Sequence, residues 1–158
     1  MVFIKILDIK SLISPSSGSS SDETTGDNMY KDIIESICKS YTLYVASLFG
    51  KKEFKIFDYN DIFPLSTSAP FVEIKPKESL NYEIDLSTLK YTPSEVVLAI
   101  FPINENISLF YSTDGALFNN IQNESKITIP SDVDKLYIKI KNNSDTNSFN
   151  LYSIIIIY

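Results

Sequence analysis

Acidic side chains are the groups of this 158-residue chain that come closest to a catalytic pattern. Glu73, Glu83 and Asp85 occur in segments where apolar and polar residues alternate. A glycoside hydrolase needs only two positioned carboxyl groups, so an acid-pair enzyme is one reading of these residues. The alternation places all three acids on the outward face of predicted strands, where charged side chains are usually only solvated. We therefore expect a polar surface here and no catalytic residue.

Asp132 and Asp134 form a second acidic pair, separated by one residue in a segment that follows Pro130. Two carboxylates at this spacing could supply part of a calcium site, but the remaining ligands of a calcium-binding loop are missing. Pro, Ser and Asp residues are typical of turns. The segment is therefore interpreted as a turn before a strand, and the sequence predicts no metal site and no cofactor.

The side chains that most catalytic sites require are absent from the sequence. It contains no His, no Arg and no Trp, and its one Cys is Cys38. Catalytic systems that pair Ser or Cys with His need an imidazole base, which this chain cannot supply. Structural zinc or an intrachain disulfide would need further Cys or His residues. Cys38 lies beside the apolar stripe of a predicted helix, so we interpret it as an ordinary small residue and predict that the protein is not an enzyme.

The charge balance bears on possible partners. All 14 positive charges are Lys, and 20 acidic residues give a net charge of -6. A chain without Arg cannot make the bidentate guanine contacts typical of nucleic-acid binders, so we expect no nucleic-acid partner. No stretch reaches the ~20 apolar residues of a membrane-spanning helix, and the apolar run at 154–157 is far too short. The sequence therefore predicts no membrane span.

Three Asn residues, Asn106, Asn123 and Asn142, each begin an Asn-X-Ser triplet, the acceptor sequence for N-linked glycans. All three fall at predicted turns or strand ends, where a glycan could be attached in an exported or virion protein of a glycosylating host. A chain rich in Asn and Ser also produces such triplets by chance, which is the simpler explanation. They are kept as candidate glycosylation sites.

The first 28 residues are predicted to form an arm. Residues 2–7 are typical of one short strand, but Lys5 and Asp8 interrupt the apolar run, so no signal peptide is evident. Residues 14–28 form a polar, Ser-rich linker that cannot by itself offset the entropy of becoming ordered. Such an arm could dock on a neighbouring subunit or be held by its own chain.

A helix and a hairpin are predicted for residues 29–70. In residues 29–39 apolar side chains recur on one helical face, which indicates one short helix. Residues 41–49 are β-branched and aromatic, and a turn at Gly50 would bring residues 54–59 back as a second strand. This pattern predicts a β-hairpin.

Residues 71–158 carry the pattern of an antiparallel β-sandwich. Seven or eight short runs of alternating apolar residues are separated by turn signals every ~8–12 residues, with no helical pattern between them. Residues 95–101 are apolar in both phases, which predicts a central strand. The fold class is therefore mainly β, with a jelly-roll or immunoglobulin-like sandwich, and residues 29–158 could form one domain.

The final apolar strand, in residues 149–158, has two possible explanations. Tyr152, Ile154, Ile156 and Tyr158 share one phase, and the other phase is apolar as well. A strand that is apolar on both faces is either central in the sandwich or packed against another subunit. The first explanation is favoured, and the four residues named here are kept as a candidate interface.

Residues 107–158 also carry a family resemblance. They contain the hairpin sequence Leu109-Phe110-Tyr111-Ser112-Thr113-Asp114-Gly115-Ala116-Leu117-Phe118, then the strand sequence Lys135-Leu136-Tyr137-Ile138-Lys139, and finally a polar loop before the apolar terminal strand. This third of the chain resembles small β-sandwich modules in virion proteins of phages and archaeal viruses. The resemblance implies a capsid, tail or surface-accessory role, and it concerns the fold without any chemical motif.

The leading expectation is a non-enzymatic structural protein of a virion or similar assembly. Its partners would be other copies of itself or other virion proteins, and its location the virion, or the host cytoplasm during assembly. The alternative is a carbohydrate- or receptor-binding module with a glycan or host receptor as partner, because Tyr-rich sandwiches can present aromatic platforms to sugars. The second alternative is the small acid-pair glycoside hydrolase.

Overall fold

A computed structural model describes residues 23–64 and 70–158, the side chains of residues 23–28 excepted. The strand expected at residues 2–7 and the linker residues 14–22 lie outside the described residues. The helices are α2 (Glu23–Leu48), α3 (Tyr59–Ile62) and the 3-10 helix η1 (Leu86–Thr88). The strands are β1 (Phe54–Asp58), β2 (Val72–Ile74), β3 (Ser79–Asp85), β4 (Glu95–Phe101), β5 (Ile107–Ser112), β6 (Asn119–Ile121), β7 (Ser125–Thr128), β8 (Lys135–Asn142), β9 (Phe149–Leu151) and β10 (Ser153–Ile157).

The strands pair as a series of nested antiparallel partners. β1 pairs with β10, β2 with β9, β3 with β8, β4 with β7, and β5 with β6. Two further antiparallel pairings, β10 with β4 and β5 with β8, join these pairs into sheets. The result is one sheet in the order β1-β10-β4-β7, a second in the order β3-β8-β5-β6, and the short pair β2-β9. The prediction of a mainly β, antiparallel protein is confirmed.

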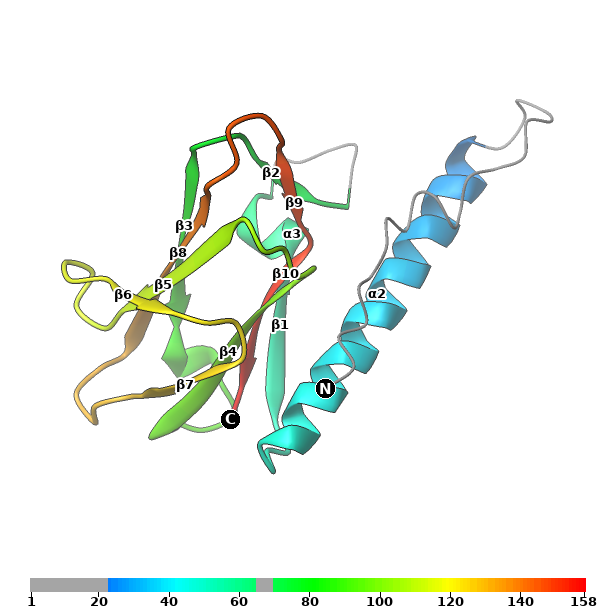
Figure 1. Ribbon diagram of the computed structural model, residues 1–158. Coiled ribbons are helices and arrows are strands. Elements are labelled where there is room, and N and C mark those ends of the chain that lie inside the picture. Colours follow the sequence, from blue (N-terminus) through cyan, green and yellow to red (C-terminus); the bar gives the residue numbers. More distant parts are fainter. Residues whose placement is uncertain (1–22, 65–69) are drawn as a thin grey trace.

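The two four-stranded sheets share one hydrophobic core (Figure 1). Leu98 and Ile154 enter it from the first sheet, and Ile84, Ile138 and Ile140 enter it from the second. All five side chains are almost fully buried. Because successive residues of a strand point to opposite faces, every second residue of β8 and β10 reaches this core. Burial of this apolar surface is the main stabilising contribution of the two-sheet arrangement.

The opposite face of the first sheet is covered by α2 (Figure 1). Ile34, Cys38 and Val45 of the helix pack against Val97 of β4 and Ile155 of β10. The two central strands of this sheet are therefore buried on both faces, as their sequences predict. The final strand is likewise central, since β10 lies between β1 and β4.

The predicted hairpin of residues 41–49 and 54–59 is wrong. Residues 41–48 continue α2, and β1 pairs with β10 instead. The reason is visible in burial: Cys38, Thr42 and Val45 are buried at intervals of three and four residues, while Leu43 and Tyr44 are exposed. Packing one helical face on the sheet outweighs the modest strand preference of β-branched and aromatic residues.

The start of the helix and the start of the sandwich also differ between the prediction and the structure. The helix begins at Glu23, inside the segment expected to be a linker, and is longer than the eleven residues predicted from residues 29–39. β1 lies before residue 71 but belongs to the same sheet as β10. The boundary expected at residue 71 therefore falls within a sheet.

The tight turn predicted at Ser112-Thr113-Asp114-Gly115 joins β5 to β6. The Asp114 carboxylate accepts hydrogen bonds from the backbone N–H groups of Leu117, at 2.9 Å, and Ala116, at 2.8 Å, and from the Ser112 hydroxyl at 2.7 Å. These bonds favour the ionised carboxylate and lower the pKa of Asp114 to about 2. Gly115 has a φ of 75°, and the ring of Tyr137 lies 3.2 Å from where a Cβ would stand, so this position requires glycine.

We predict that Asp114→Ala destabilises the protein in a pH-dependent way. Because the pKa in the folded protein is lower than the unfolded value of about 3.9, the contribution of the carboxylate is complete above pH 4 and is lost as pH falls toward 2. The measurement is urea unfolding of both proteins between pH 7 and pH 2. Asp132→Ala, at another exposed loop acid, is the control. A stability difference of the same size at pH 7 and pH 2 would contradict the prediction.

Candidate functional site

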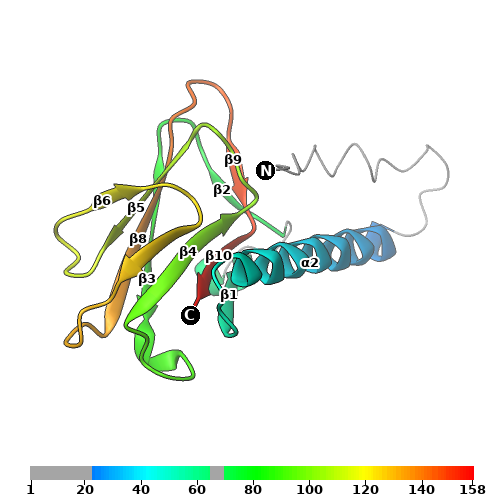
Figure 2. The same ribbon diagram turned by 60° about the horizontal axis from the view of Figure 1, so that its bottom comes forward.

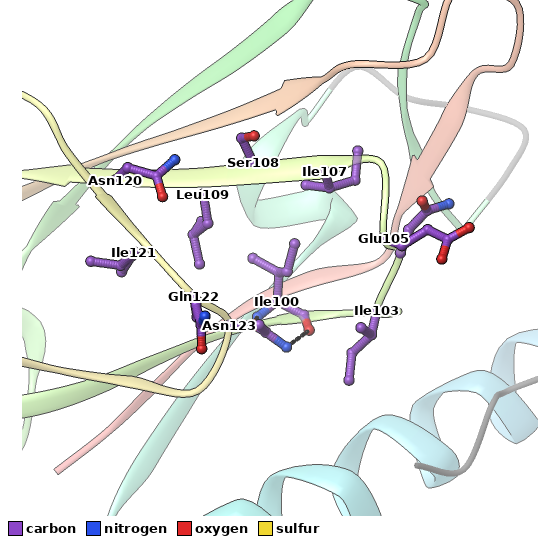
Figure 3. A pocket seen from close by; sticks show the side chains of 11 residues that line it. Ile100, Ile103, Glu105, Ile107, Ser108, Leu109, Asn120, Ile121, Gln122 and Asn123 are labelled. Carbon is purple, nitrogen blue, oxygen red and sulfur yellow. Dashed lines mark hydrogen bonds between the residues drawn. The ribbon is translucent and has the colours of Figure 1, made fainter.

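A cavity of about 270 Å³ opens between the two sheets, where the β4–β5 and β6–β7 connections meet. Its base is apolar: Ile100 of β4 and Leu109 of β5 are nearly fully buried and point toward each other across it (Figure 3). Ile103, Ile107 and Ile121 add further apolar surface. The cavity is therefore built from two separate stretches of chain that the strand pairing brings together.

The rim of this cavity is polar and uncharged, with one exception. Asn104, Asn120 and Gln122 contribute side-chain amides, and Glu105 is the one ionisable residue of the lining. Glu105, Asn120 and Gln122 are exposed to solvent. Amides offer both donors and acceptors, so this rim suits a neutral polar ligand. A single carboxyl group does not provide the acid pair that glycoside hydrolysis needs.

Asn123 forms one wall of the cavity and has a structural role. β7 begins at Ser125, so the backbone of Ile100 has no strand partner on that side. The Asn123 side chain replaces it: its Oδ1 accepts from the Ile100 N–H at 2.7 Å, and its Nδ2 lies 3.5 Å from the Ile100 carbonyl. Nδ2 also donates to the Tyr41 hydroxyl at 3.0 Å, and Tyr41 in turn donates to Glu124 at 2.8 Å. One side-chain amide thus joins α2, β4 and the β6–β7 connection.

The three acids predicted to face outward do so. Glu73, Glu83 and Asp85 are all exposed. Glu83 forms an ion pair with Lys135 at 2.7 Å. Asp85 caps η1 by accepting from the Ser87 N–H at 2.9 Å, and its hydrogen bonds to Ser87 lower its pKa. These contacts account for two of the acids without any catalytic role.

Asp132 and Asp134 line a second, shallower hollow of about 200 Å³ beside η1. Both carboxylates are exposed, and the backbone carbonyl of Asp134 accepts from the Leu86 N–H at 2.8 Å. In residues 23–64 and 70–158, no three His, Cys, Asp or Glu residues gather closely enough to hold a metal ion. The segment is a connection between β7 and β8, as the sequence predicts.

Cys38 is buried between α2 and β10. Its Sγ lies 3.1 Å from the hydroxyl oxygen of Ser153. Burial raises the pKa of the thiol to about 11, although hydrogen bonds with Ser153 and Thr42 oppose this effect. The thiol is therefore protonated at neutral pH and is a poor nucleophile.

The three candidate glycosylation sites lie in very different surroundings. Asn106 is exposed. The amide nitrogen of Asn123 donates a hydrogen bond to the Tyr41 hydroxyl. Asn142 is 1% exposed, and its Nδ2 donates to the carbonyls of Ile74 at 2.9 Å and Asn147 at 2.8 Å. A glycan on Asn123 or Asn142 would break these bonds, so Asn106 is the accessible position of the three.

The candidate interface residues of the final strand are interior. Tyr152, Ile154, Ile156 and Tyr158 are all buried within the chain. Ile154, Ile156 and Tyr158 belong to the core between the sheets, whereas Tyr152 packs on the α2 side with Phe101. Tyr152 faces α2 and not the core between the sheets because it lies between β9 and β10, where the alternation of side chains along a strand is interrupted. These four side chains do not form an exposed surface.

Exposed apolar side chains gather elsewhere, on α2. Met29, Leu43, Tyr44 and Leu48 are between 50% and 61% exposed and make up half of the large apolar side chains exposed in the described residues. Figure 2 shows the C-terminal end of α2 beside β1 and β10 and its N-terminal end extending away from the labelled strands. The outward side of α2 that carries these residues is a second candidate surface. It was missed because residues 41–49 were assigned to a strand.

Comparisons with known proteins do not identify a function for these surfaces. No family model, no curated protein and no solved structure matches the chain. Over the described residues, no helix has the length and apolar character needed to cross a membrane.

We predict that Asn142→Ala destabilises the protein by about 1–3 kcal/mol, because the Ile74 and Asn147 carbonyls lose their buried donor. Asn106→Ala, at the exposed Asn of the same triplet type, is the matched control and should change stability by less than about 0.5 kcal/mol. Chemical denaturation measures both. Equal effects of the two substitutions would contradict the structural role of Asn142.

Proposed function

We propose that this chain is a non-enzymatic structural subunit of a virion or similar protein assembly, built as a jelly roll. The observation that supports the fold assignment is the nested strand pairing. If the eight strands of the two large sheets are numbered in chain order, the sheets read 1-8-3-6 and 2-7-4-5. This is the order produced when one long antiparallel hairpin is rolled into two sheets, the jelly-roll arrangement of many viral capsid domains. The immunoglobulin sheet orders, ABED and CFG, are different.

The apolar outward side of α2 supports a role in assembly. Soluble monomers rarely expose a contiguous apolar patch, and such patches commonly mark protein–protein contacts. The partners we propose are other copies of this chain or other virion proteins, in the virion or in the host cytoplasm during assembly. The protonated thiol of Cys38 and the single carboxylate of the cavity support a protein that works through its surfaces.

The mass of the protein in solution tests this proposal. We expect native mass spectrometry and sedimentation velocity to give a multiple of the single-chain mass that rises with concentration, and electron microscopy to show closed or repeating assemblies. High salt should not dissolve these assemblies, since apolar contacts are not screened by ions. A mass equal to one chain at every concentration, by both methods, would overturn the proposal.

A second candidate function is a carbohydrate- or receptor-binding module, and the cavity between the sheets is the observation that favours it. Jelly rolls also occur in lectins. The amides of Asn120 and Gln122 could exchange hydrogen bonds with sugar hydroxyls above the apolar base of Ile100 and Leu109. The lining contains no aromatic ring, so recognition would depend on these amides rather than on stacking. The acid-pair hydrolase has less support, since only Glu105 is available in this cavity.

Titration with a panel of neutral monosaccharides, followed by NMR, tests the second candidate. Binding should shift the backbone signals of residues 103–109 and 120–123. Gln122→Ala should weaken binding about fivefold, the equivalent of one hydrogen bond of about 1 kcal/mol. Asn119→Ala, an exposed Asn of β6 outside the lining, should leave affinity unchanged. Unchanged spectra at saturating sugar would remove this candidate.

A further inference from the structure

β3 is an edge strand whose outer side has hydrogen-bonding groups that no described strand uses. β8 pairs with its inner side. Just before β3, the Glu78 carbonyl accepts from the β8 backbone at 3.0 Å, and just after it, the Leu86 N–H donates to the Asp134 carbonyl at 2.8 Å. Because hydrogen-bonded and non-hydrogen-bonded pairs alternate along an antiparallel ladder, the even-numbered residues of β3 bond to β8. The N–H and C=O groups that point outward belong to Ser79, Asn81 and Glu83.

β3 is the least protected edge strand of the two large sheets. Edge strands are normally kept from pairing with other chains by being short or by carrying Lys or Pro. β6 has three residues, whereas β1 and β7 have five and four and contain Lys55 and Lys126, respectively. β3 has seven residues and contains neither Lys nor Pro. It therefore offers the longest row of backbone groups to an added strand.

The two faces of this edge define the strand that fits it. On the inner face, Leu80 and Tyr82 are half-buried and pack against the core between the sheets, so apolar side chains beside them would complete their burial. On the outer face, Glu83 and Asp85 are exposed. The one ion pair of Glu83 within the described residues is with Lys135, on the β8 side. A fitting strand therefore has an apolar inward phase and a cation in its outward phase.

Residues 2–7, which are predicted to form a strand and lie outside the described residues, have this pattern. Val2, Ile4 and Ile6 share one phase and are all apolar. Lys5 lies in the other phase and is the one charged residue of the segment. Burying the ammonium group between the sheets would be costly, so one orientation of the added strand is strongly preferred. That orientation turns the three apolar side chains inward and sets the ammonium group on the face that carries the two acids.

The position of residues 1–22 favours the β3 edge of a second copy over that of the same chain. These residues precede the N-terminal end of α2, which extends away from the labelled strands (Figure 2). α2 covers one face of the first sheet, and the second sheet, which contains β3, packs on the other face. A segment returning to its own β3 would therefore have to pass round the first sheet, whereas the β3 edge of a neighbouring copy is open to it from solvent.

We propose that the β3 edge is the docking site for residues 2–7 of a second copy of this chain, which add to the second sheet as a further strand. This inference rests on the proposed assembly function and names the contact that joins the copies. Hydrogen bonds to the outward backbone groups of β3 supply affinity in this kind of contact, and the alternation of apolar and charged side chains supplies specificity.

Sedimentation velocity on the full chain and two variants tests the docking site. Asn81→Pro removes an outward N–H that β8 does not use, which an edge strand tolerates. Deletion of residues 2–8 removes the added strand. Each change should raise the dissociation constant of the assembly at least about tenfold. Asn120→Pro, the same substitution on the shorter β6 edge, is the matched control and should leave the assembly intact. Circular dichroism checks that all variants keep the helix and sheet content of the parent.

A charge reversal tests the orientation of the added strand. Lys5→Glu would set a third carboxylate beside Glu83 and Asp85 and should weaken the assembly. Lys10→Glu makes the same change in charge outside the strand and should have little effect. Equal effects of the two substitutions would overturn the orientation with Lys5 on the outer face.

A mixing experiment distinguishes exchange between copies from docking within one chain. The Asn81→Pro variant keeps residues 2–7, and the deletion variant keeps an intact β3 edge, so a mixture should contain complexes of the two that neither variant forms alone. A mixture of single chains would overturn the exchange. An assembly that survives deletion of residues 2–8 would overturn the β3 contact but leave the assembly proposal standing, whereas a wild-type protein of single-chain mass at every concentration would overturn both.

Discussion

β10 is completely enclosed, and the rest of the molecule is arranged around it. Its five residues are all inaccessible to solvent. β1 and β4 pair with its two edges, the second sheet covers one face, and α2 covers the other. Burial on four sides explains why β10 has no charged residue and why α2 must be apolar toward the sheet. The bend at Tyr152 lets the chain leave the β2–β9 pair and enter this position.

The β content and several individual strands could be predicted from local sequence alone. Alternation is a local property, so residues 80–86 and 135–141 indicated half-exposed strands, and continuous apolar runs indicated β4 and β10 as central. The turn at Ser112-Thr113-Asp114-Gly115 was equally local, because Asp and Gly each favour a specific backbone conformation there. These features need no knowledge of the rest of the fold.

Sequence-based prediction failed where contacts between residues far apart in the sequence determine the local structure. Residues 41–48 have a composition common in strands, yet they are helical because Thr42 and Val45 can be buried on a sheet whose central strands, β4 and β10, lie about 50 and more than 100 positions later. The structural roles of Asn123 and Asn142 could not be predicted either, because their amides bond to backbone groups that only the folded chain brings near. The cavity also escaped prediction, since Ile100 and Gln122 meet only once β4 and β6 are in place. For the candidate site, the sequence could restrict the available residue types but could not bring them together.

The nested pairing has a consequence for how the chain is made. β5 and β6 are neighbours in sequence and can pair as soon as both leave the ribosome, whereas β1 must remain unpaired until β10, almost 100 residues later, has been synthesised. Contacts of such long range are slow to form. During this interval β4 also lacks its β10 partner, and α2 has no complete sheet to cover. The newly made chain therefore exposes two unpaired apolar strand edges at once, and edges of this kind make an incompletely folded chain prone to aggregation.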